Sequence, residues 1–280
     1  MSSTDVLTVA APAKVNLFLH VTGRRADGYH LIESLYALID FADFVSLERR
    51  RDGAIVRTRD LPGVDAATDL TLRAAALLKS ATGTAEGVAI AVDKRIPLGG
   101  GLGGGSSDAA SVLLALNRLW RCGLERSELA KLGATLGADV PFFVHGENAV
   151  VRGIGEIIEP VSLTRQWLAI AMPPTSVSTA GIFAARELTR STPSAKMSVF
   201  SESYGHNDLE PVAASRHPEV ARALKALGSR VADVRMTGSG ACVFAACESA
   251  DAARTALQAL PDGSAGRVVR TLARHPLAQW

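Results

Sequence analysis

Polar and apolar residues alternate along the first segment of the chain. From residue 14 to residue 21, the odd positions are all apolar and most even positions are polar. Because successive side chains of a strand point to opposite faces, this period of two predicts a strand with one apolar face. Residues 31–39 fit a helix and a strand equally well by their pattern. The strand-like run 44–47 follows so closely that a strand is favoured there.

The remaining elements form two groups. Apolar residues at helical spacing predict helices over residues 69–78, 109–120, 127–136, 180–188, 218–227 and 250–260. Short apolar runs predict strands over residues 88–92, 167–171, 231–236, 241–246 and 267–272. After residue 160 this order predicts a split β-α-β, ferredoxin-like layer packed on a sheet. We therefore expect two domains, 1–160 and 161–280, and a mobile loop at Ser191–Ser203.

Composition narrows the classes of function. The chain has 280 residues, with 30 Lys and Arg against 28 Asp and Glu. A chain of this length can bury a large core, and a net charge of +2 argues against nucleic-acid or membrane-surface binding. Three cysteines without a C-x-x-C pair argue against a disulfide framework. The polar N-terminus and the lack of an apolar stretch of ~18 residues predict a cytoplasmic protein without a membrane partner.

The segment Pro97–Ser107 carries the strongest chemical signal. Six of its seven central residues are glycine, and the run lies between a predicted strand and a predicted helix. Glycine removes the Cβ atoms that block close approach of a ligand, and successive backbone amides with a helix N-terminus form an anion site. The run therefore predicts a phosphate-binding loop. We expect Ser106 or Ser107 to cap the following helix and Asp108 to lie in its first turn.

Two common phosphate motifs do not explain this loop. The P-loop requires a lysine where Gly105 stands. The spacing of Gly99, Gly101 and Gly104 does match the dinucleotide fingerprint. That fold also needs a second strand soon afterwards, ending in an acidic residue, whereas residues 121–137 predict a turn and another helix. The loop therefore binds phosphate in another structural context.

The loop resembles the ATP loop of the galacto-, homoserine, mevalonate and phosphomevalonate (GHMP) kinase superfamily. The superfamily's third motif is similar to Thr237, Gly238, Ser239 and Gly240. Four further segments are similar to the branch that phosphorylates 4-diphosphocytidyl-2-C-methyl-D-erythritol: Pro12–Leu17, Arg25–His30, Gly137–Phe142 and Asn207–Glu210. The resemblance covers residues 10–247. It implies an α+β, two-domain GHMP kinase fold: an N-terminal ribosomal-S5-domain-2-like layer, a C-terminal ferredoxin-like layer, and the active site in the cleft between them.

The resemblance also implies an activity. The substrate's 2-hydroxyl would be phosphorylated by ATP in the non-mevalonate isoprenoid pathway, giving ADP by direct in-line transfer. Mg²⁺ is expected with ATP, although the sequence identifies no metal ligands. The partners would be small molecules, namely ATP and a cytidine-diphosphate sugar alcohol, with a monomer or a weak homodimer as the assembly. Another GHMP-type small-molecule kinase and a catalytically silent nucleotide-binding regulator remain as alternatives.

The implied site residues fall into three sets. The catalytic set is Asp139, as general base, with Lys14 beside it. The ATP-binding set is Pro97, Leu98, Gly99, Gly100, Gly101, Leu102, Gly103, Gly104, Gly105, Ser106, Ser107 and Lys94, the last expected near the adenine. The substrate-binding set is Asn16, Tyr29, His30, Thr179 and Phe183. Without the resemblance, Lys14 and Asn16 read as exposed polar residues, His30 as an ordinary satisfied histidine and Phe183 as a core residue.

Overall fold

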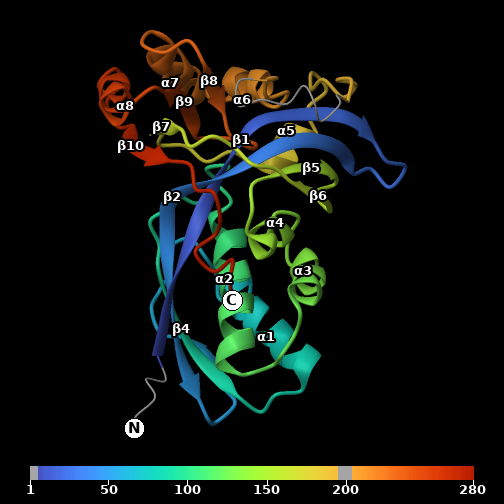
Figure 1. The fold of residues 1–280 in the computed structure, drawn as a ribbon. Helices are drawn as coiled ribbons and strands as arrows, with labels where there is room; N and C mark the ends of the chain where they lie inside the picture. The colour runs from blue at the N-terminus through green and yellow to red at the C-terminus, as the bar shows by residue number, and fades with distance from the viewer. Residues whose placement is uncertain (1–5, 195–203) are drawn as a thin grey trace.

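Two long antiparallel strands organise the first half of the fold. The computed structural model describes residues 6–194 and 204–280, and Figure 1 shows these strands bending across the whole molecule. They are β1 (Val6–Arg24) and β2 (His30–Arg50), paired from Val6 with Glu48 to Arg24 with His30. The predicted strands at 14–21 and 31–39 are thus confirmed. Three register shifts interrupt the pairing, and each lets the two strands bend.

The first sheet is completed by four shorter strands. Its order is β3-β4-β2-β5-β6, with β1 on the other edge of β2. The added strands are β3 (Ile55–Arg57), β4 (Gly87–Asp93), β5 (Ala149–Gly153) and β6 (Ile157–Pro160). Four helices pack beside this sheet in Figure 1: α1 (Leu70–Thr82), α2 (Gly104–Leu119), α3 (Arg126–Ala134) and α4 (Val140–His145). Their apolar faces bury one face of the sheet in a single hydrophobic cluster.

The second sheet follows residue 160. It contains β7 (Trp167–Met172), β8 (Val234–Met236), β9 (Val243–Cys247) and β10 (Ala265–Arg270), in the antiparallel order β10-β7-β9-β8. The accompanying helices are α5 (Thr179–Phe183), α6 (Glu210–Arg216), α7 (Pro218–Gly228) and α8 (Ala250–Leu257). This arrangement confirms the predicted split β-α-β, ferredoxin-like layer.

The two sheets pack on each other, and helices cover both outer faces. Alternate residues of β5 show the layering, because Val150 belongs to the cluster between the two sheets, while Ala149 and Val151 belong to the cluster under the helices. A third cluster joins the far face of the second sheet to its own helices. The chain after β10 returns to the first sheet, where the Leu272 amide donates to the Leu38 carbonyl at 2.8 Å. The division into domains 1–160 and 161–280 stays a prediction.

Several predicted helix boundaries are wrong, those at the start of α2 and the end of α5 by the most, and the sequence patterns did not predict α4 and α6. Helix α2 begins at Gly104 inside the glycine run, and Gly103 caps it in a left-handed conformation with φ of 71°. Neither predicted serine is therefore the N-cap, and Asp108 lies beyond the first turn. Glycine at 103 adopts this conformation without Cβ strain, so the helix starts before the serines. Helix α5 ends at Phe183 instead of continuing to residue 188.

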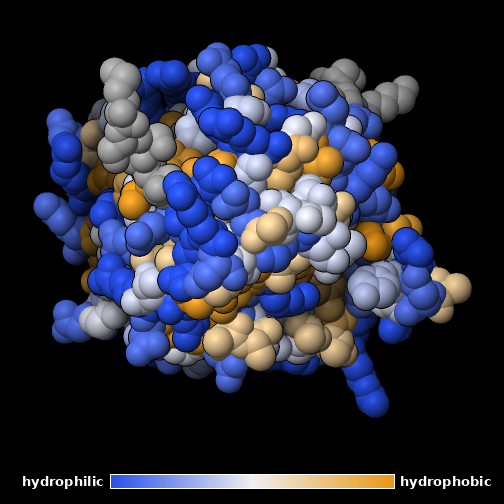
Figure 2. Space-filling model, turned by 90° about the horizontal axis from the view of Figure 1, so that it is seen from below, coloured by the Kyte–Doolittle hydropathy of each residue, from blue (hydrophilic) through white to orange (hydrophobic). Residues whose placement is uncertain are grey.

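Polar and apolar side chains share the face of the molecule that is seen from below (Figure 2). Figure 2 shows one end of the molecule, where apolar side chains appear in separate groups between charged ones. No helix in the described part of the chain is long and apolar enough to span a bilayer. All three cysteines are free thiols. The predicted mobile loop at Ser191–Ser203 lies mostly outside the described residues, which omit 195–203.

Candidate active site

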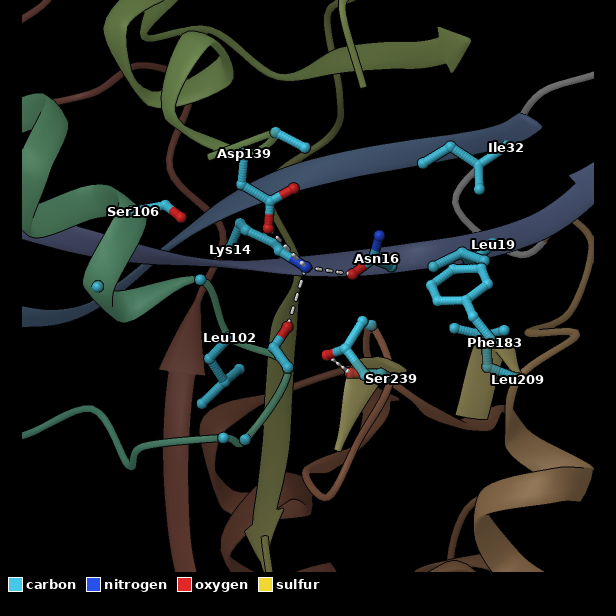
Figure 3. A pocket seen from close by; sticks show the side chains of 18 of the residues that line it. Lys14, Asn16, Leu19, Ile32, Leu102, Ser106, Asp139, Phe183, Leu209 and Ser239 are labelled. Atoms are coloured by element: carbon cyan, nitrogen blue, oxygen red, sulfur yellow. Dashed lines mark hydrogen bonds and ion pairs between the residues drawn. The ribbon is translucent and has the colours of Figure 1, made fainter. Parts of the chain in front are cut away.

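A cavity of about 930 Å³ lies between the glycine loop, the two long strands, the start of α4 and helix α5. Both halves of the chain line it, because Gly238 and Ser239 of the loop 237–240, which packs against the glycine loop, are on its wall (Figure 3). The cavity brings together these residues of the expected set: Lys14, Asn16, Tyr29, His30, Lys94, Pro97–Ser106, Asp139, Thr179, Phe183, Gly238 and Ser239. Ser107, Thr237 and Gly240 do not line it.

The glycine loop is held by backbone contacts on both sides. The Lys14 amide of β1 donates to the Leu102 carbonyl at 3.0 Å. From the other side, the Cys242 amide donates to the Gly100 carbonyl at 3.1 Å. The approach is close at Gly101, where φ is 75° and an added Cβ would lie 2.1 Å from the Thr237 carbonyl oxygen. Only glycine allows the two loops to meet here.

Lys14 and Asp139 lie side by side at the start of α2 (Figure 3). The Lys14 ammonium is buried, 3.9 Å from Asp139 Oδ2. It also donates to the Gly101 carbonyl at 2.9 Å and to Asn16 Oδ1. Burial lowers the pKa of Lys14, and the negative charge of Asp139 opposes that shift. The Asp139 side chain is 28% exposed and faces the cavity, so it can reach a substrate hydroxyl.

Tyr36 contacts both of these residues, although the sequence patterns did not identify it. Its hydroxyl donates to Asp139 Oδ1 at 3.0 Å, and the Lys14 ammonium lies 4.9 Å from the centre of its ring. Burial and the neighbouring Asp139 raise the pKa of Tyr36 well above its usual value. The tyrosine is therefore a neutral donor that fixes one carboxylate oxygen. The feature that could have identified Tyr36 is the pairing of the two long strands, which places it opposite Asn16.

Asn16 connects the strand to the third-motif loop. Its main-chain amide donates to Thr237 Oγ1 at 2.9 Å, and its side-chain Nδ2 donates to Ser34 Oγ at 2.9 Å. Asn207 supports the same loop from behind, because its Nδ2 donates to the carbonyls of Met236 and Gly238 at 2.7 and 2.8 Å. Thr237 does not line the cavity; its hydroxyl is hydrogen-bonded to Asn16 and Gly101, which do.

Aromatic rings gather at the other end of the cavity. The rings of His30 and Phe183 lie 5.0 Å apart at 31°, and Tyr29 is exposed beside them. Figure 3 shows Phe183 next to Leu19 and Leu209. Thr179 and Ser239 hydrogen-bond through their hydroxyls at 2.7 Å between the two ends. The cavity therefore has a polar end at Asp139 and an aromatic end suited to a flat base.

Lys94 lies under the glycine loop between two buried carboxylates. Its ammonium is 2.6 Å from Asp43 Oδ2 and 2.6 Å from Asp108 Oδ2. Asp43 Oδ1 also accepts from the amides of Arg95 and Ile96 at 2.5 and 2.8 Å. Two ion pairs hold the lysine, which lines the cavity and lies close to Gly104. Burial raises the pKa of Asp108 to about 7; the charge of Lys94 opposes this shift and that of Asp43 adds to it. Asp108 Oδ1 has no hydrogen-bond partner in the described residues.

Ser107 also has a structural contact. Its hydroxyl is fully buried and donates to the Pro12 carbonyl at 2.6 Å, which ties α2 to β1. Ser106 is the serine that faces the cavity, close to Asp139 in Figure 3. Within residues 6–194 and 204–280, no cluster of three His, Cys, Asp or Glu residues could hold a metal ion.

Two family models match the chain. The model described as "GHMP kinases N terminal domain" matches residues 69–147, which include the glycine loop and Asp139. The model described as "GHMP kinases C terminal" matches residues 184–264, which include the third-motif loop.

Curated relatives and solved structures match almost the whole chain. A 4-diphosphocytidyl-2-C-methyl-D-erythritol kinase of Thiobacillus denitrificans is 58% identical over 267 residues, 95% of this chain and 96% of that one. One from Cupriavidus necator is 53% identical, covering 96% and 94%. A crystal structure of 4-(cytidine 5'-diphospho)-2C-methyl-D-erythritol kinase matches with a TM-score of 0.84 at 35% identity, over 95% of this chain and 99% of that one. A homoserine kinase from Cytophaga hutchinsonii shares the fold, with a TM-score of 0.72. It is 19% identical, and the match covers 98% of this chain and 97% of that one.

Proposed function

This chain belongs to the GHMP kinase family, and we propose that it uses ATP to phosphorylate the 2-hydroxyl of 4-diphosphocytidyl-2-C-methyl-D-erythritol. The relatives that carry this kinase's name match the chain over nearly its full length. The product would be the 2-phosphate and ADP, a step of the non-mevalonate isoprenoid pathway. One structural observation carries the proposal: a single cavity has a phosphate-binding loop and a carboxylate–ammonium pair at one end and aromatic rings at the other.

The glycine loop is the phosphate site in this proposal. Phosphoryl transfer asks the protein mainly for positioning and charge stabilisation. The loop ends in the N-terminus of α2, whose first amides are free of intrahelical partners and whose first three residues line the cavity. The helix is buried along most of its length, so its start is rigidly fixed. The loop can therefore bind the triphosphate through backbone groups.

Asp139 is the proposed general base. One carboxylate oxygen is fixed by Tyr36, while the other lies near Lys14. In the reaction, the proton of the 2-hydroxyl moves to the carboxylate as the hydroxyl oxygen bonds to the γ-phosphorus and the bond to ADP breaks. The Lys14 ammonium lies beside this carboxylate and can offset negative charge on the transferred group.

The aromatic end would bind the cytosine. Tyr29 and Phe183 can stack on a base, and His30 can hydrogen-bond its edge. Thr179 and Asn16 lie along the path between this end and Asp139. A substrate that spans the cavity would therefore place its sugar alcohol beside the carboxylate.

Mg²⁺ is part of the proposal as the companion of ATP. This ion usually keeps several waters and binds through substrate phosphates with one or two protein oxygens, so it needs no cage of carboxylates. The Ser106 hydroxyl and the partly exposed Asp139 carboxylate are oxygen donors on the cavity wall that suit such a site. When bound, the ion would neutralise charge on the phosphates.

The test is a substrate panel. ADP release would be followed in a coupled assay with the cytidyl sugar alcohol, with mevalonate, with homoserine and with no acceptor. The proposal expects fast release with the cytidyl alcohol and little with the others. Fast release with mevalonate or homoserine would favour another GHMP-type kinase. ATP binding without turnover on any acceptor would favour a nucleotide-binding regulator.

Three remaining expectations belong to the same proposal. The chain would divide near Pro160 into domains 1–160 and 161–280. It would act in the cytoplasm on small molecules, as a monomer or a weak homodimer. Sedimentation of the purified protein at several concentrations would test the assembly.

A further inference from the structure

Arg190 connects His30 to the chain that follows α5. Its Nε donates to His30 Nε2 at 3.0 Å. Its other nitrogens donate to main-chain carbonyls, Nη1 to Leu188 at 3.0 Å and Nη2 to Phe183 at 3.1 Å and to Ala185. One guanidinium therefore holds the histidine of β2 and the backbone of Phe183 in a fixed relation. These are the two residues whose rings meet at the aromatic end of the cavity.

This contact determines where the imidazole carries its proton. A guanidinium only donates hydrogen bonds and stays charged at any ordinary pH. His30 Nε2 must then be an unprotonated acceptor, so the proton of the neutral ring resides on Nδ1. Burial and the positive charges of Arg190 and Arg24 lower the pKa of His30, which favours the neutral ring. The other polar atom of the ring is thus an N–H donor.

We propose that Arg190 is a positioning residue for base specificity, because it holds His30 as an Nδ1–H donor toward the pyrimidine. The ring nitrogen N3 is an acceptor in cytosine and carries a hydrogen in uracil. A fixed donor at that edge would pair with cytosine and would meet the N3–H of uracil hydrogen to hydrogen. Free of the guanidinium, His30 could take either tautomer and accept from uracil as well. This inference rests on the proposed function, since it assigns a role within the proposed cytidine site.

A purely structural role is the competing explanation. Arg190 bonds to three carbonyls after Ile182, so its loss could simply shift Phe183. Such a shift would weaken cytidyl and uridyl ligands alike. A change of proton position would instead alter the ratio between them. The ratio and the tautomer are therefore the two measurements that separate the explanations.

The first experiment is nitrogen NMR of the histidine rings in the ligand-free protein. We expect His30 to carry its proton on Nδ1 in the wild type near pH 7.5. In Arg190→Met, Nε2–H should appear and the ring should titrate nearer its usual range. Arg190→Lys keeps a donor-only cation and should restore the Nδ1–H form in part. Arg186→Met, an exposed arginine of the same segment, is the matched control and should leave the spectrum unchanged.

The second experiment measures kcat/KM for the cytidyl substrate and for its uridyl analogue. We expect Arg190→Met to reduce the preference for cytidyl by about tenfold or more, and Arg186→Met to leave it unchanged. A wild-type His30 with its proton on Nε2, or an Arg190→Met preference equal to that of the wild type, would overturn the proposal. The NMR result does not depend on turnover. If the wild type released no ADP, the proposed function would fail while the tautomer assignment could still be read.

Discussion

Replacing Gly101 by alanine tests how the glycine loop and the third-motif loop form one site. The added Cβ would lie 2.1 Å from the Thr237 carbonyl oxygen, more than 1 Å closer than an ordinary contact of 3.4 Å. The residue also has a φ of 75°, and a left-handed conformation costs a non-glycine residue about 1–2 kcal/mol. The loops must therefore separate by roughly an ångström. That shift would break the 2.9 Å bond from the Lys14 ammonium to the Gly101 carbonyl.

The expected result is a loss of turnover larger than the loss of stability. A misplacement of about 1 Å near catalytic groups can cost about 10²-fold in rate, so kcat should fall by about that factor in a coupled ADP assay. Gly123→Ala is the matched control, because Gly123 has a φ of 73° but nothing within 4 Å of the added Cβ. It should lose about 1–2 kcal/mol of stability and keep its kcat. Wild-type kcat in Gly101→Ala would refute the reasoning.

Three further substitutions test separate contacts. Phe183→Ala should raise KM for the cytidyl substrate about 5- to 100-fold and leave KM for ATP nearly unchanged. A KM for the cytidyl substrate equal to that of the wild type would count against base stacking. Tyr36→Phe should lower kcat about tenfold by freeing Asp139 Oδ1, and an unchanged kcat would remove Tyr36 from the site. Burial raises the pKa of Asp108 to about 7, so the folded state binds this proton more tightly than the unfolded state does. The resulting contribution to the free energy of unfolding is fully present below about pH 4 and is lost as the pH rises through 7. Urea unfolding should therefore show the wild type losing stability relative to Asp108→Asn over that range, and parallel curves would contradict it.

Helices and strands could be predicted from the sequence more completely than the contacts between distant residues. Alternation and helical spacing located the long strands and most helices, because these periods follow from backbone geometry. The start of α2 was misplaced since serine is the commoner cap, whereas Gly103 adopts the left-handed conformation itself. The end of α5 was also misplaced. The following turn is held by Arg190, a contact between residues that no local period reveals.

The site was predicted from motifs, and its supporting residues were not. Lys14 and Asp139 are 125 positions apart, yet their motifs named both. Tyr36 depends on which residue of β2 faces Asn16, and the register shifts between the strands cannot be read from the sequence. Lys94 was expected near the adenine because it lies close to the loop. Its two carboxylate partners come from β2 and α2, so only the folded chain brings them together.

The most direct test of the account is single-turnover phosphorylation by Asp139→Asn. The substitution keeps the side chain's size and removes the carboxylate that would accept the proton. ATP affinity, measured by calorimetry, should match that of the wild type because the glycine loop is untouched. The rate at which the 2-phosphate of the cytidyl substrate forms should fall by about 10²–10⁴-fold. A rate near that of the wild type would contradict the assignment of Asp139 as the base.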